Sequence, residues 1–125
     1  MDAKMFAEEL LKRDSRVRYI GIVDRQYNVL VSQMREGVTS VTPAGTDRRI
    51  IQLMPPLLLD AVEKLWAQVL GAVELVTVRY EKMLLVFFSK GNCVVVLSFN
   101  PDVTTPFMSA LTDFIQSLSS QYLTD

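Results

Sequence analysis

The residue types that most often carry chemistry are scarce in this chain. It holds one cysteine, Cys93, and no histidine, which excludes an internal disulfide, a Cys/His zinc site and a histidine general base. Cys93 is followed by the apolar residues 94–97, so we expect a buried strand thiol; a reactive thiol would need an exposed, electropositive position. The order Lys90-Gly91 is the reverse of the Gly-Lys pair that a P-loop uses to bind phosphates.

Three acidic residues and one pair of arginines are the other candidates. Glu8 and Glu9 are adjacent on a predicted helix, so they point about 100° apart and do not suit an acid/base pair. Asp24 stands between two predicted strands, where aspartate commonly forms the turn. Arg48 and Arg49 are a candidate contact for an anionic group or partner; the alternative is a pair of solvated surface residues. We predict no catalytic residue, no cofactor and no metal site, and a protein that is not an enzyme.

Composition places the chain among ordered proteins. Half of its 125 residues are apolar and 22% are charged, and this length is typical of one domain, so we predict a single domain over residues 1–125. The longest apolar run, residues 83–88, is far shorter than the ~20 residues of a membrane-spanning helix. No signal peptide is recognisable, and the lone cysteine favours the cytoplasm. A net charge of −1 argues against nucleic acid as a partner.

Apolar periodicity predicts an order of helix, two strands, long central helix, three strands and closing helix. The loops between the last three strands are short and polar, which favours consecutive antiparallel pairing. Gly21, inside the first strand, indicates a bulge or a close backbone approach. The fold class is therefore α/β (α+β), with a five-stranded, mainly antiparallel sheet and helices on its faces. The predicted elements are a helix at Ala3–Leu11, strands at Val17–Asp24, Asn28–Met34, Val73–Tyr80, Met83–Ser89 and Cys93–Phe99, and a helix from Thr105.

The central helix carries the strongest functional signal. Pro55-Pro56 predicts a break near Met54, because proline lacks an amide hydrogen and its ring clashes with the preceding turn. A second helical stretch follows to about Leu70, ended by Gly71. Its apolar residues cover a wider arc than one sheet surface would bury, so either the helix tucks fully onto its own sheet or a second chain covers it. Trp66 is the expected anchor of such an interface.

The element order and the first hairpin resemble the Roadblock / dynein light chain family, a relative of the longin and profilin folds. The hairpin residues that carry the resemblance are Tyr19-Ile20-Gly21-Ile22-Val23-Asp24 followed by Asn28-Val29-Leu30-Val31-Ser32. The stretch from Arg18 to Val38 is also similar to small uncharacterised archaeal proteins. The chain departs from the family pattern in the first turn, where no glycine follows Asp24, and at Pro55-Pro56.

This resemblance implies a cytoplasmic homodimer in which the central helix and the third strand meet their symmetry mates. It also implies a non-catalytic scaffold or regulatory module that binds a small GTPase or a larger cytoplasmic complex. The alternative is a profilin-like ligand-binding sensor domain, which needs a cavity that this bulky core tends to fill. The expected dimer-interface residues are Leu58, Leu59, Val62, Leu65, Trp66, Val69, Glu74, Val76 and Val78.

Overall fold

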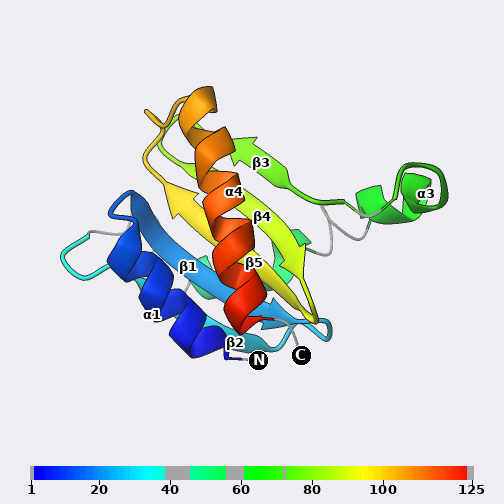
Figure 1. Ribbon diagram of the computed structural model, residues 1–125, viewed down its shortest axis with the longest axis horizontal. Helices are drawn as coiled ribbons and strands as arrows, with labels where there is room; N and C mark the ends of the chain where they lie inside the picture. The colour runs from blue at the N-terminus through cyan, green and yellow to red at the C-terminus, as the bar shows by residue number, and fades with distance from the viewer. Residues whose placement is uncertain (1, 39–45, 56–60, 72, 124–125) are drawn as a thin grey trace.

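A computed structural model describes residues 2–38, 46–55, 61–71 and 73–123. Its elements follow the predicted order, except that the central helix is divided into two (Figure 1). The elements are α1 (Ala3–Arg13), β1 (Val17–Asp24), β2 (Val29–Met34), α2 (Thr46–Pro55), α3 (Ala61–Leu70), β3 (Val76–Arg79), β4 (Leu84–Lys90), β5 (Cys93–Phe99) and α4 (Thr105–Tyr122).

The strands form one five-stranded sheet in the order β2-β1-β5-β4-β3. Every pairing in this sheet is antiparallel. β5 is buried along its whole length, and the first five residues of β4 are buried too, as their nearly continuous apolar sequences predict for strands covered on both faces. β2 and β3 are the two edge strands among the described residues.

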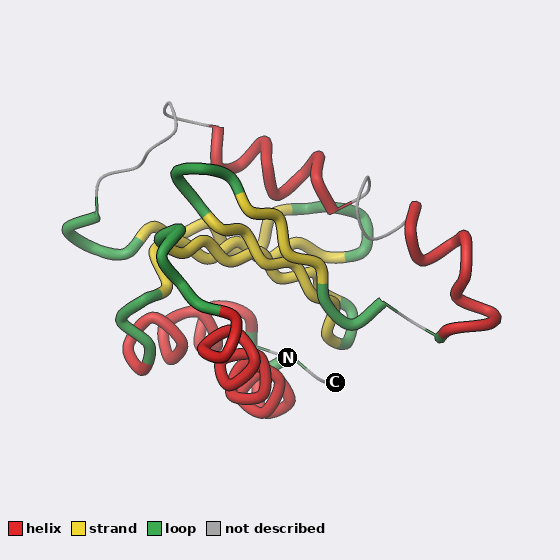
Figure 2. The backbone as a smooth tube through the Cα atoms, turned by 90° about the horizontal axis from the view of Figure 1, so that it is seen from above, coloured by secondary structure: helices red, strands yellow, loops and turns green. Residues whose placement is uncertain are grey.

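Helices cover both faces of the sheet, but unequally. Figure 2 shows α1 and α4 together on one face, which we call the α1/α4 face, and α2 on the other, which we call the α2 face. Alternate residues of each strand point to opposite faces, so two separate cores form. The α1/α4 core includes Phe6, Leu10, Ile20, Phe88, Leu97 and Ile115. The α2 core includes Tyr19, Val23, Ile51, Leu85, Phe87 and Val96.

Gly21 lets α2 approach the sheet closely. A Cβ atom at this position would lie 2.5 Å from Ile51 Cγ2 and 2.9 Å from the Tyr19 hydroxyl oxygen, so only glycine leaves room for the Ile51 side chain. The close approach predicted from the sequence is confirmed. A bulge also occurs nearby, where the β1–β2 register shifts between Ile22 and Val23.

Asp24 organises the turn between β1 and β2. Its carboxylate accepts hydrogen bonds from the backbone amides of Gln26 and Asn28, both at 2.9 Å, and from Asn28 Nδ2 at 3.1 Å. The Asn28 amide bond is the largest influence that lowers the pKa of Asp24; partial desolvation opposes it, and the other two hydrogen bonds reinforce it. Tyr27 adopts a left-handed conformation, with φ of 62°. The predicted turn role of Asp24 is confirmed.

The helix break agrees with the prediction, and the largest difference between predicted and observed bounds is at β3. The central helix breaks after Pro55, as expected, and residues 56–60 lie outside the described residues. The strand predicted from Val73 begins only at Val76. Val73 packs against the α2 core and Leu75 against the α1/α4 core, and an extended strand cannot place residues two apart on opposite faces.

Replacing Gly21 with alanine should destabilise the protein by about 1–3 kcal/mol, the usual cost of forcing an extra methyl group into a packed core. The new Cβ would lie 2.5 Å from Ile51 Cγ2, so α2 must move away from β1. Urea denaturation of the two proteins measures the difference. In an Ile51→Ala background the largest clash disappears, and Gly21→Ala should then cost clearly less. An equal cost in both backgrounds would contradict the close approach.

Asp24 should make the stability of the protein depend on pH. Its pKa is lowered in the folded protein, so its contribution is fully present above the ordinary value of 3.8 and is lost as the pH falls through the lower, folded value. Asp24→Asn should lack this dependence, because an amide does not ionise. Urea midpoints of both proteins from neutral to strongly acidic pH provide the test, and a carboxyl resonance of Asp24 that titrates at or above 3.8 would exclude the lowered pKa.

Candidate protein-interaction surface

The structure shows where the side chains that could carry chemistry lie and what they contact. Cys93 is buried in the α1/α4 core. Glu9 forms an ion pair with Arg13, with 3.0 Å between Oε2 and Nε, and Glu8 is exposed on the same helix. Within the described ranges there is no cluster of His, Cys, Asp or Glu able to hold a metal ion. In the same ranges no helix combines the length and the apolar character needed to cross a bilayer.

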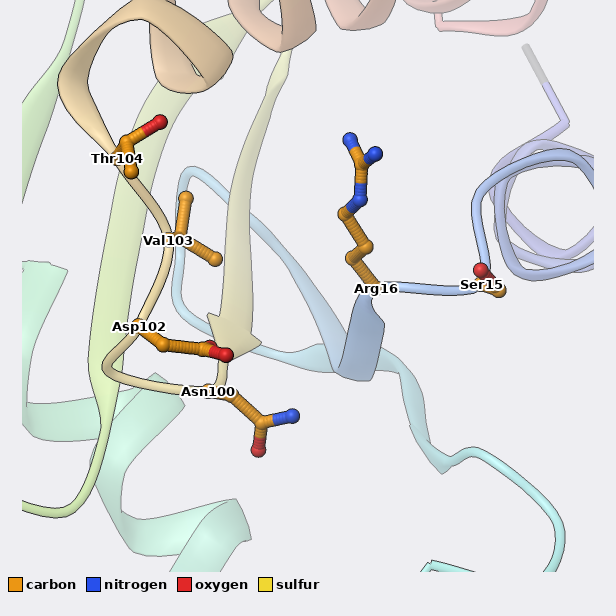
Figure 3. A pocket seen from close by; sticks show the side chains of 6 residues that line it. All are labelled: Ser15, Arg16, Asn100, Asp102, Val103 and Thr104. Carbon is orange, nitrogen blue, oxygen red and sulfur yellow. The ribbon is translucent and has the colours of Figure 1, made fainter.

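A cleft of about 350 Å³ lies where β5 leads into α4, but its polar groups do not converge. In Figure 3 the Arg16 side chain extends from the start of β1 in the direction opposite to Asn100. Asn100 Oδ1 already accepts a hydrogen bond from Arg18 Nη1 at 2.7 Å. A site for acid/base catalysis needs groups aimed at one point, so this cleft does not provide one. Its lining residues are Ser15, Arg16, Asn100, Asp102, Val103 and Thr104.

α3 presents an apolar surface to solvent. Leu65, Trp66, Val69 and Leu70 are 74%, 59%, 76% and 75% exposed. Their spacing places them on one side of the helix, and we call them the α3 stripe. Lys64 and Gln68, on the other side, are exposed as well. The apolar side of α3 is therefore uncovered where the structure describes its side chains. Figures 1 and 2 show the reason: α3 lies beyond the start of β3, apart from the body of the sheet.

The two edges of the sheet differ in how well they are protected. At β2, Val23 pairs with Val29 and Ile22 with Val31, so a bulge interrupts the ladder at Leu30, and α1 contacts this strand. Bulges and covering helices are common ways to block unwanted pairing at an edge. β3 pairs with β4 residue for residue without a register shift. The edge at β3 is therefore the one suited to pairing with another strand.

The hydrogen-bond alternation identifies which β3 groups face outward. The Tyr80 amide donates to the Met83 carbonyl at 2.8 Å, so these residues form a hydrogen-bonded pair. Antiparallel ladders alternate bonded and non-bonded pairs. Val78, opposite Leu85, is consequently bonded to β4, whereas Thr77 and Arg79 direct their backbone N–H and C=O groups to the open edge. Arg79 is anchored separately, because its guanidinium donates to the carbonyls of Pro101 and Val103 at 2.6 and 3.0 Å.

Among the described residues, the α2 face is incompletely covered beside β3. Several apolar side chains there pack on the α2 core but are only partly buried, and Tyr80 is 48% exposed. We call this set the β3 strip. It adjoins the open edge of the sheet on the side where α3 lies. The residues of the β3 strip are Val73, Val76, Val78, Tyr80 and Met83.

Most of the predicted interface residues that the structure describes belong to these surfaces. Leu65, Trp66 and Val69 lie in the α3 stripe, and Val76 and Val78 in the β3 strip. Sequence reasoning missed Leu70, which its spacing from Trp66 could have revealed. It also missed Met83 and Tyr80, which only strand pairing brings to the strip.

The other predicted positions are less closely tied to these surfaces. Glu74 is exposed but precedes β3 instead of lying in it. Arg49 is exposed on α2. Leu58 and Leu59, and the side chains of Val62 and Arg48, lie outside the described part of the structure.

Comparison with solved structures finds this arrangement in several proteins. The gliding protein MglB of Thermus thermophilus has a TM-score of 0.70 at 18% identity, over 94% of this chain and 84% of that one. MglB of Myxococcus xanthus has 0.70 at 13% identity, over 97% and 96%. A Roadblock/LC7 domain from Streptomyces avermitilis has 0.69 at 10% identity, over 98% of both chains. No protein-family model and no curated protein matches the sequence.

The chain has the Roadblock/LC7 fold. The predicted fold class is thereby confirmed, with a wholly antiparallel sheet and a central helix divided in two. Another structure with this fold shows an MglB in a tetrameric arrangement, at a TM-score of 0.63 and 17% identity. The similarity to small archaeal proteins stays a prediction.

The open edge of β3 leads to a prediction with a built-in control. Thr77→Pro removes an amide that faces outward, so the β3–β4 ladder and the fold should persist while pairing of β3 with another chain is blocked. Val78→Pro removes an amide that bonds to β4 and should lower the thermal midpoint strongly. Circular dichroism and light scattering distinguish the two. If Thr77→Pro destabilises the protein as much as Val78→Pro, the assignment of outward groups is wrong.

Proposed function

We propose that this protein works as a homodimer with a regulatory or scaffolding role and without a catalytic centre. The observation that carries the proposal is the exposed α3 stripe, in a chain whose β3 edge pairs with β4 on one side only. A second copy is a partner that supplies both an open β3 edge and an α3 stripe. The isologous contact of a two-fold dimer uses the same patch twice.

The strand contact would join the two sheets through β3. Antiparallel pairing uses the outward backbone groups of Thr77 and Arg79 in both copies. The register follows from charge, because a two-fold axis at Arg79 would place like charges opposite each other, which is destabilising. An axis at Val78 avoids this and brings the two β3 strips together on the α2 face.

The α3 helices of the two copies would then cover the two β3 strips. Burying a side chain such as Leu, Val or Trp contributes roughly 1.5–3 kcal/mol. The four residues of the α3 stripe are 59–76% exposed, so in two copies they supply at most roughly 9–17 kcal/mol, against about 4–15 kcal/mol of lost freedom on association. The free energy gained by burying the α3 stripe exceeds the cost of association over most of this range. Strand pairing alone would bury little apolar area.

The regulatory role is supported by the Roadblock resemblance and the Roadblock/LC7 fold. That resemblance implies a cytoplasmic module, formed by residues 1–125 as one domain, that binds a small GTPase or another protein of a larger complex. The exposed side of α2 offers a surface for such a partner, since it carries Arg49 and Leu53, the latter 61% exposed. In this arrangement dimerisation places two copies of α2 on the same face of the joined sheet.

One observation favours the alternative of a ligand-binding sensor domain. The bulky core was expected to fill the space between sheet and helix, yet a cleft of about 480 Å³ lies between α4 and the strands β3 and β4. This cleft is on the α1/α4 face, opposite the β3 strip. Ligand binding there is compatible with a dimer held together on the α2 face.

Trp66→Asp should convert the dimer into a folded monomer, because a charge at the centre of the α3 stripe cannot be buried without a partner. Gln68→Asp is the matched control: it adds the same charge to the other side of the helix and should leave the dimer intact. Light scattering after size-exclusion chromatography gives the masses. Trp66 is the only tryptophan, so wild-type fluorescence should also shift to the red on dilution. A Trp66→Asp protein with unchanged dimer mass, or a wild type that is always monomeric, would refute the proposal.

A further inference from the structure

The cleft between α4 and the β3 end of the sheet is large enough for a small molecule. Its volume of about 480 Å³ lies within the ~300–1,000 Å³ usual for ligand sites. It belongs to the α1/α4 face and does not contain any residue of the α3 stripe. The residues that line it are Leu75, Thr77, Arg79, Leu84, Ser109, Thr112 and Asp113.

The cleft is apolar at its floor and polar at its rim. Leu84 is 2% exposed, and Leu75 packs on the α1/α4 core. Past Leu75 and Thr112 the floor continues as a narrow crevice between Phe88 and Ile115, where no water-sized space remains. Thr77, Ser109 and Asp113 are exposed at the rim. A ligand that fits this gradient has an apolar body and one polar end.

The charges around the cleft indicate the sign of that polar end. Arg79 donates through Nη1 to the Pro101 carbonyl and through Nη2 to the Val103 carbonyl. Its guanidinium is therefore directed to the loop before α4, and its aliphatic stem is the part left to line the cleft. Asp113 is the other charged residue of the described lining. The rim thus combines one carboxylate with the hydroxyl groups of Thr77 and Ser109.

We propose that this cleft binds a small primary amine with an apolar body. An ammonium group carries three N–H donors and no acceptor. A carboxylate and neighbouring hydroxyl oxygens are acceptors that match it, and the bond to the carboxylate is strengthened by charge. The apolar body would lie on Leu75 and Leu84, with its end toward the crevice at Phe88. A carboxylate-bearing molecule of the same shape would be repelled by Asp113.

Three probes of equal chain length test the proposal: hexylamine, 1-hexanol and hexanoate. Backbone amide resonances are followed by NMR at neutral pH while each probe is added to the full-length protein. Hexylamine should bind most tightly and hexanoate most weakly, with shifts at Leu84, Thr112 and Asp113. Equal affinities for the three probes, or shifts confined to the α3 stripe, would overturn the proposal.

Two variants separate the charge from the cavity. Asp113→Asn should weaken hexylamine binding about two- to fivefold, the usual range for a solvent-exposed ion pair. The same variant should leave the affinity for hexanol unchanged. Asp102→Asn, which removes an exposed carboxylate elsewhere, should change neither affinity. Ser109→Trp should block the mouth and abolish binding of both, whereas Ser117→Trp, exposed further along α4, should not. Full hexylamine affinity in Asp113→Asn would exclude the carboxylate as the recognition group.

Discussion

Within the part of the chain that the structure describes, one short helix covers the α2 face of the five-stranded sheet, and that limit on coverage shapes the rest of the molecule. α2 reaches the sheet where Gly21 leaves space for Ile51, and Ile51 is fully buried. This contact ties α2 to β1 and β2, on the side of the sheet away from β3. The strip beside β3 is only partly buried, and the apolar residues of α3 are exposed. The incomplete cover of one face is thus the physical basis of the proposed dimer.

Proline and glycine determine where α2 and α3 end. A continuous central helix would lie across the α2 face, but α2 ends at Pro55, since a proline pair cannot continue the helical hydrogen bonds. α3 then ends at Leu70, before Gly71 with its φ of +85°. α3 lies apart from the body of the sheet (Figure 1), and its apolar side chains are exposed.

Two arginines near the first hairpin, Arg18 and Arg35, make contacts that stabilise the fold. Arg35 donates to the carbonyls of Val17 and Asp14, and Arg18 to the side chain of Asn100. Together with Arg79, which donates to Pro101 and Val103, they fasten loops to the ends of strands. A guanidinium used in this way satisfies backbone carbonyls that strands and helices leave without partners. These three arginines therefore support the ends of the sheet.

The sequence by itself determined the number and order of the strands, because period-two alternation and continuous apolar runs are local signals. It also predicted the break near Pro55, the turn at Asp24, and either a bulge or a close approach at Gly21. Only the tertiary structure decided that Val73 and Leu75 face opposite cores, that Tyr80 and Met83 join the β3 strip, and that a cleft opens beside α4. These features depend on which strands become neighbours and on how far a helix extends over them. Such long-range geometry is not encoded in any short stretch of residues, so pattern analysis could not supply it.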